Sequence, residues 1–206
     1  MESSGTVPPS LGLQATLPQW AFIAIIWVCV LVAGCLLIGR LYVRKKHMGG
    51  IKPDDYFLCS AFFFFVILAI LQTIQVPSAY FISRLAIGLE TDPLMATAQG
   101  NLYSRLEFPI IKDFWTELWT IKAAFLCLYY SILKDDKKYR LLWWFVVAFT
   151  LLAYVGCWIA SIMVCVPLRT YFEFGKCFNP RGSMIAIIFS TAVDVLTDIM
   201  SKSTPN

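Results

Sequence analysis

Three stretches of the chain carry no charged residue, and each is long enough to cross a bilayer as a helix. Residues 20–39 form the first, and twenty residues give ~30 Å of helix, which matches the hydrocarbon core. Residues 56–76 and 141–166 form the other two, and each is followed directly by a proline, Pro77 or Pro167, which we expect to end the helix. These stretches predict spanning helices, and therefore an all-α transmembrane bundle.

The composition supports a protein whose surface is exposed partly to lipid and partly to water. Of the 206 residues, 59% are hydrophobic and 15% are charged, whereas about a quarter of an average soluble domain is charged. The charged residues are also bunched along the chain, so they cannot cover a surface that faces water on all sides. We therefore expect the lipid bilayer to be the main partner and expect no nucleic-acid partner, since a net charge of +4 is weak support for one.

Two further apolar stretches contain charged residues, and we expect them to span as well. Glu117 and Lys122 lie within residues 114–133, and Asp194 and Asp198 lie within residues 182–200. Each central charge costs ~2.5 to 3.5 kcal/mol on insertion scales unless it is paired. The predicted organisation is an extracellular segment 1–19, a helical domain 20–200 with spans near 20–42, 56–76, 114–133, 141–166 and 182–200, and a cytoplasmic tail 201–206.

The basic residues indicate the orientation in the membrane. Nine of the seventeen Lys and Arg residues lie in the two short connections 40–55 and 134–140, while residues 1–19 contain none. The positive-inside rule then places the N-terminus outside and the C-terminus in the cytoplasm after five crossings. We expect no cleaved signal peptide, a location in the plasma membrane, and basic inner loops that could meet a cytoplasmic signalling partner.

Asp54 and Asp55 follow "GGIKP" and open the second predicted helix. Free backbone N–H groups and the positive end of the helix dipole favour carboxylates at this position. We favour a helix cap over a binding role for this pair.

Lys122 is the charged residue that most needs a partner. It lies eight residues inside its apolar stretch, which is ~12 Å of helix and further than a lysine side chain easily reaches to water. Glu117 is a poor partner, because five residues place it about 140° away around the helix. The carboxylates of the last helix are better candidates, although Asp194 and Asp198 share one face and would repel unless one is protonated or a cation lies between them.

These four ionisable residues are the candidates for an intramembrane polar or ligand site. A contact between Lys122 and Asp194 could handle protons or ions, since ionisable groups in membrane helices are often functional. It could equally be a structural polar contact that fixes helix packing.

The cysteines predict one disulfide and no metal site. Cys165 and Cys177 have eleven residues between them and lie on the oxidising side in this topology, so we expect them to be bonded. The cysteines inside apolar stretches are expected to be small buried hydrophobes: Cys29, Cys35, Cys59, Cys127 and Cys157. His47 is the only histidine and no CxxC pair occurs, so neither a metal site, a cofactor site nor a Ser-His-Asp triad is expected.

Several short motifs, taken in order, resemble one family. They are "GRLYVRKK" with Arg40 and Arg44, "IKPDDYFL" with the aspartate pair, "LWTIKAAFLCLYYSIL" with Lys122, "CVP" with its later Cys177, and "STAVDVLTDIM". This pattern resembles the fungal rhodopsin-like domain family of seven-helix membrane proteins, some of which are receptor-like. The resemblance covers roughly residues 20–200 and implies an extracellular N-terminus.

The chain departs from that family in three ways. The outer stretch "AIGLETD" lacks the second glycine and the histidine of a Gly-x-Gly-x-His pattern. Asp194 stands where the family usually has asparagine, whereas Asp198 matches a family aspartate. The chain turns polar at "SKSTPN", so it resembles the first five of seven helices and is expected to be a fragment of that bundle.

Two functions remain open on these observations. The first is an incomplete, receptor-like signalling protein without catalytic activity, whose small-molecule ligand is unknown. The alternative is a small oligomeric transporter or proton-coupled carrier that uses Lys122, Asp194 and Asp198. We expect no enzyme, because two aspartates on one helix do not face each other across a cleavage site.

Overall fold

The computed structural model describes residues 17–47, 50, 52–86, 92–133, 137–163, 172 and 180–203. Within these residues the chain forms five helices, α1 (Gln19–His47), α2 (Pro53–Ala86), α3 (Pro93–Leu133), α4 (Lys137–Met163) and α5 (Pro180–Ser203). No strand occurs in this part of the chain. The predicted all-α fold is confirmed.

Three of the described helices are long and apolar enough to cross a membrane. They are α1, α2 from Pro53 to Leu85, and α4 from Trp143 to Met163, with mean hydropathies of 3.0, 2.5 and 2.1. The apolar part of α5 is shorter, Met184–Thr197. The crossing of α3 and α5, and with it the five-span topology, stays a prediction.

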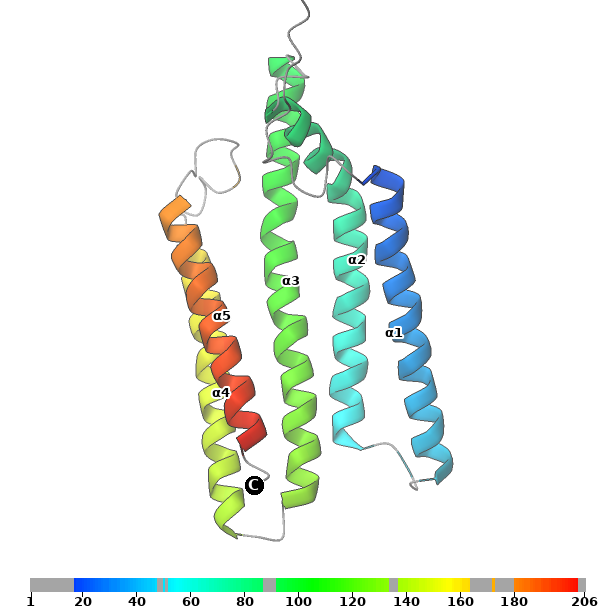
Figure 1. Cartoon of the computed structure of the whole chain (residues 1–206), viewed down its shortest axis with the longest axis vertical. Helices are drawn as coiled ribbons and strands as arrows, with labels where there is room; N and C mark the ends of the chain where they lie inside the picture. The colour runs from blue at the N-terminus through cyan, green and yellow to red at the C-terminus, as the bar shows by residue number, and fades with distance from the viewer. Residues whose placement is uncertain are drawn as a thin grey trace, which may run out of the picture.

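The helices lie in two groups (Figure 1). The first consists of α1, α2 and α3, with the most extensive contact between α2 and α3 and a smaller one between α1 and α2. The second is the α4–α5 pair, in which α5 packs mainly on α4 and α4 makes a limited contact with α3. The two groups are therefore joined through α3.

Many large apolar side chains lie on the outside of this bundle, and several of the most buried apolar side chains are small. Trp20, Leu31 and Leu152 are 73%, 67% and 72% exposed, whereas Ala69 and Cys157 are 2% and 0% exposed. Helices in lipid gain little from burying large apolar groups, because lipid tails are as apolar as leucine, and small residues let the helix backbones approach. The pattern is the one expected for helices that face lipid.

Pro77 does not end α2, contrary to the expectation from the sequence. The helix continues through it to Ala86, although an internal proline costs about 3 kcal/mol. Polar contacts hold this end of α2: Ser78 Oγ donates to Gln99 Oε1 over 2.8 Å and Gln75 Nε2 donates to Glu107 Oε2 over 2.6 Å. Packing against α3 therefore outweighs the local preference of the proline.

The connection 77–113, whose pattern is mixed, is mostly helical in the structure. α3 begins at Pro93 and passes through Pro109. Asp92 caps it, since its Oδ1 accepts hydrogen bonds from the backbone N–H groups of Leu94 at 3.0 Å and Met95 at 3.4 Å. Pro93 occupies the first helical position, where its missing N–H has no helical partner to lose.

Gly34 marks the close approach of α1 to α2 and gives a first prediction. A Cβ at Gly34 would lie 3.2 Å from Phe62 Cζ, whereas a Cβ at Gly39 meets nothing within 4 Å. Gly34→Leu should lower the free energy of unfolding by about 1–3 kcal/mol through overpacking. The measurement is thermal unfolding in detergent, with Gly39→Leu as the matched control on the same helix. Equal stability of the two variants would contradict this packing.

Candidate functional site

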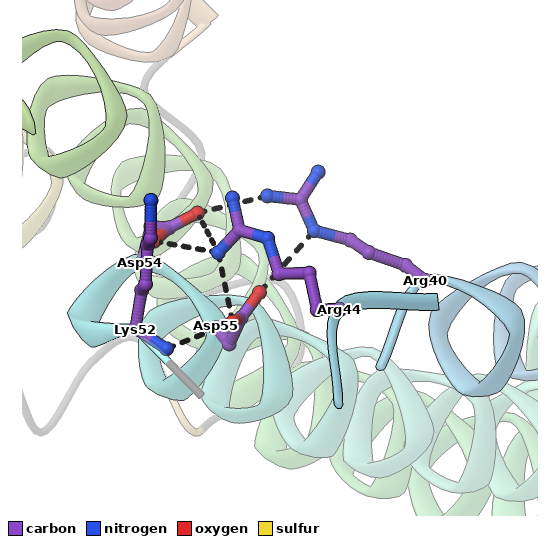
Figure 2. A network of polar contacts seen from close by, with 5 residues as sticks. All are labelled: Arg40, Arg44, Lys52, Asp54 and Asp55. Carbon is purple, nitrogen blue, oxygen red and sulfur yellow. Dashed lines mark hydrogen bonds and ion pairs between the residues drawn. The ribbon is translucent and has the colours of Figure 1, made fainter. Parts of the chain in front are cut away.

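Four charged residues meet where α1 ends and α2 begins (Figure 2). Arg44 Nη1 lies 2.7 Å from Asp54 Oδ2 and 2.8 Å from Asp55 Oδ2. Arg40 Nη2 donates to Asp54 Oδ2 over 2.8 Å, and Arg40 Nε lies 3.3 Å from Asp55 Oδ1. Each arginine thus contacts both aspartates, and we call these four residues the Arg–Asp cluster.

The local sequence places the two arginines near the end of α1 and the two aspartates at the start of α2. Arg40 and Arg44 are four residues apart on α1 and so share one helix face. Gly50 has a φ of 144° in the connection that follows, a conformation that favours glycine. Pro53 opens α2, and Asp55 Oδ2 accepts a hydrogen bond of 3.1 Å from the backbone N–H of Lys52, as the third helical residue does in a capping box.

The expected helix cap is thus present at Asp55, but both aspartates also bind arginines. Asp55 is 0% exposed, Asp54 3% and Arg44 8%. Two positive and two negative charges cancel, and the burial of Asp54, Asp55 and Arg44 depends most on the contacts that these three residues make with one another. Because both carboxylates are occupied by guanidinium groups, the arrangement is suited to holding α1 against α2.

Lys122 of α3 meets Asp194 of α5, the partner expected from its depth in the helix. Its Nζ lies 2.5 Å from Asp194 Oδ1, donates to the Asp194 carbonyl oxygen over 2.9 Å and donates to Thr197 Oγ1 over 2.6 Å. The Lys122 side chain is 10% exposed and that of Asp194 is 23% exposed. The contact is present; its role in function stays a prediction.

Glu117 lies away from Lys122, as its angular position on the helix indicates. It lines a cavity of about 290 Å³ between α1, α2 and α3, together with Leu37, Arg40 and Phe62. The side chain of Asp198 and the pair Cys165 and Cys177 lie outside the described residues. Within the described part, no group of three or more His, Cys, Asp or Glu residues is arranged to hold a metal ion.

The expectation that the cysteines of the apolar stretches are buried is wrong for three of them. Cys29, Cys35 and Cys59 are exposed, Cys127 is partly buried and only Cys157 is buried. The reason is that the outer faces of α1 and α2 are apolar too, so an apolar environment in the sequence does not identify an inward position. A thiol is weakly polar and suits such a face.

Lys112 makes buried contacts that the sequence patterns did not predict. Lys112 is 7% exposed on α3, and its Nζ donates to the Trp158 carbonyl oxygen over 3.2 Å and contacts Ser161 Oγ. Nζ also lies 4.6 Å from the centre of the Trp158 ring. The signal was available, because Lys112, Trp115, Trp119 and Lys122 repeat at helical spacing on one face of α3.

Comparison with known proteins identifies a family model that matches most of the chain. The family model of the fungal rhodopsin domain matches residues 39–205, a range that includes the Arg–Asp cluster and the contact between Lys122 and Asp194. No curated protein matches the chain, and no solved structure does.

Proposed function

The chain belongs to the fungal rhodopsin domain family, and from this premise we propose that it is a receptor-like signalling protein of the membrane without catalytic activity. Its working part would be the α4–α5 pair, which moves against a frame formed by α1, α2 and α3. The frame is held at one end by the Arg–Asp cluster and along its length by the packing of α2 on α3.

The contact between Lys122 and Asp194 is the observation that carries this proposal. The packing contact between α3 and α5 is small, whereas α5 packs on α4. Lys122 nevertheless makes an ion pair and two hydrogen bonds to the last turns of α5. A polar link between two loosely packed groups of helices can exist in a made and a broken state, which is the kind of two-state element that a switch requires.

The orientation we propose puts the Arg–Asp cluster and the basic connections at the cytoplasmic face of the plasma membrane. Arg40 and Arg44 are occupied by the two aspartates, whereas Lys45 and Lys46 beside them are exposed. Exposed basic side chains next to a fixed helix end favour an acidic partner, by complementary charge. A cytoplasmic signalling protein would bind there.

The test removes the link without leaving a buried charge. A double variant, Lys122→Met with Asp194→Leu, lacks both charges and should favour the broken state. Expressed in a fungal host at the level of the wild type, it is expected to change the transcript profile without any added ligand. Lys122→Arg, which keeps the charge, should behave as the wild type.

Arg84→Met is the control for loss of a basic side chain, because Arg84 is exposed and lies in the last turn of α2, at the other end of that helix from the basic connection where the partner would bind. A double variant whose transcript profile equals that of the wild type would overturn the proposal. Uptake into proteoliposomes that disappears in the same double variant would instead establish the carrier function, for which Lys122 and Asp194 are the obvious ionisable groups.

A further inference from the structure

A second cavity lies between α2, α3 and α4, and Phe57 at one end of it follows the Arg–Asp cluster by less than one helical turn. Its volume is about 400 Å³, within the range of small-molecule sites, ~300 to 1,000 Å³. Phe57, Leu126 and Val147 belong to its mainly apolar wall. The space is therefore large enough for a small organic molecule, and its wall would accept an apolar one.

Two residues of the wall each have one buried polar atom without a hydrogen-bond partner. Trp119 is 6% exposed and Thr150 is 7% exposed, and neither the indole Nε1 of the first nor the hydroxyl Oγ1 of the second has one. Both residues line the cavity, one from α3 and one from α4. A buried hydrogen-bond donor without a partner lowers the stability of the fold. These two atoms therefore indicate that a further group, which would accept their hydrogen bonds, binds nearby.

The other polar groups of the wall are neutral, and several already have partners. Trp143 Nε1 donates to the Leu126 carbonyl oxygen over 2.9 Å, and Thr116 Oγ1 lies 3.2 Å from the Tyr154 hydroxyl. Among the residues that line the cavity in the described part of the chain, none is charged. A charged ligand would find no opposite charge there, whereas a neutral molecule loses little on leaving lipid.

We propose that this cavity binds a neutral, mostly apolar small molecule that carries a hydrogen-bond acceptor, such as a ketone or an ester. The carbonyl oxygen would accept hydrogen bonds from the Trp119 indole N–H and the Thr150 hydroxyl, and the apolar part would lie against the wall. The inference rests on the proposed function for its meaning, since a receptor needs a ligand site, but binding can be measured without any signal.

The experiment compares two molecules of matched shape that differ in one oxygen. Protein in lipid nanodiscs is labelled with benzophenone under near-ultraviolet light, and the labelled peptides are identified by mass spectrometry. Dicyclohexyl ketone and dicyclohexylmethane then compete with the label. They are compared at equal molar ratios of competitor to lipid, because both partition into the bilayer. We expect labelling of the α3 and α4 segments around Trp119 and Thr150. We also expect about tenfold stronger competition by the ketone, from the two hydrogen bonds together.

Three substitutions locate the effect. Trp119→Phe removes the N–H and keeps a ring, and Thr150→Val removes the hydroxyl at nearly constant volume; each should reduce the advantage of the ketone several-fold. Trp158→Phe is the matched control, because the Trp158 Nε1 is also buried without a partner but does not line this cavity. It should leave the advantage unchanged.

Equal competition by the ketone and the hydrocarbon, or labelling spread over the lipid-facing helices, would overturn the site. The same holds if Trp158→Phe reduces the advantage as much as Trp119→Phe does. These results do not depend on the signalling test: a ketone site in a chain without any transcript response would leave this inference standing and remove the receptor proposal.

Discussion

Replacement of Arg44 by methionine is expected to lower the free energy of unfolding by about 3–5 kcal/mol, the cost of removing one partner from a buried ion pair. Arg44 contacts both Asp54 and Asp55, and these carboxylates are 3% and 0% exposed. Without Arg44, two negative charges at the start of α2 would share the single guanidinium of Arg40. The measurement is thermal unfolding in detergent, followed by circular dichroism.

Arg40→Met is the matched control for this prediction. Arg40 contacts the same two aspartates, but its side chain is 39% exposed, whereas that of Arg44 is 10% exposed. An ion pair open to solvent is typically worth about 0.2–1 kcal/mol, so we expect this variant to lose much less stability. If Arg40→Met proved as damaging as Arg44→Met, burial would not be what sets the strength of the cluster.

Replacement of Lys122 by methionine is expected to cost a similar amount, about 3–5 kcal/mol, for a related reason. The substitution leaves the Asp194 carboxylate without its cation and removes the hydrogen bonds of Nζ to the Asp194 carbonyl oxygen and to Thr197 Oγ1. The loss should appear first in α5. Hydrogen–deuterium exchange would therefore show faster exchange of α5 amides, with α1 and α2 unchanged.

The double variant of Lys122→Met with Asp194→Leu separates two contributions to the free energy of unfolding. One is the interaction between the two residues, and the other is the penalty for leaving one charge without its partner. Replacing both partners by apolar residues is often neutral or stabilising, so the penalty for the unpaired charge should disappear, although the polar link between α3 and α5 stays broken. The double-mutant cycle would then give a large coupling energy. Additive losses of the two single variants would show that the two residues do not act on each other.

The partner of Lys122 could be predicted because one quantity, its depth inside an apolar stretch of helix, decides it. A lysine ~12 Å inside a helix cannot reach water easily, and the last helix offers carboxylates. The Arg–Asp cluster could not be predicted in the same way. From the sequence, Arg40 and Arg44 belong to a basic helix end and Asp54 and Asp55 form a cap. Their contact depends on how the connection around Gly50 turns.

The wrong predictions of a helix end at Pro77 and of buried cysteines have a common physical origin. Local preference predicts a helix end at Pro77, but contacts between helices decide whether α2 continues. Local preference also predicts buried cysteines, but helix faces toward lipid can be as apolar as faces toward the bundle. The hydrophobic pattern therefore gives the existence of membrane helices well. It gives their ends and their inward faces poorly.

The sequence separation of the two ionic contacts sets an order of events during biosynthesis. Arg40 binds an aspartate 14 residues further along the chain, whereas Lys122 finds its α5 carbonyl partner 72 residues later. At about 5–20 residues per second of translation, the first delay lasts about one to three seconds and the second about 4–14 seconds. The α1–α2 hairpin can thus close while α3 is being made, and α3 must carry an unmatched lysine until α5 leaves the ribosome.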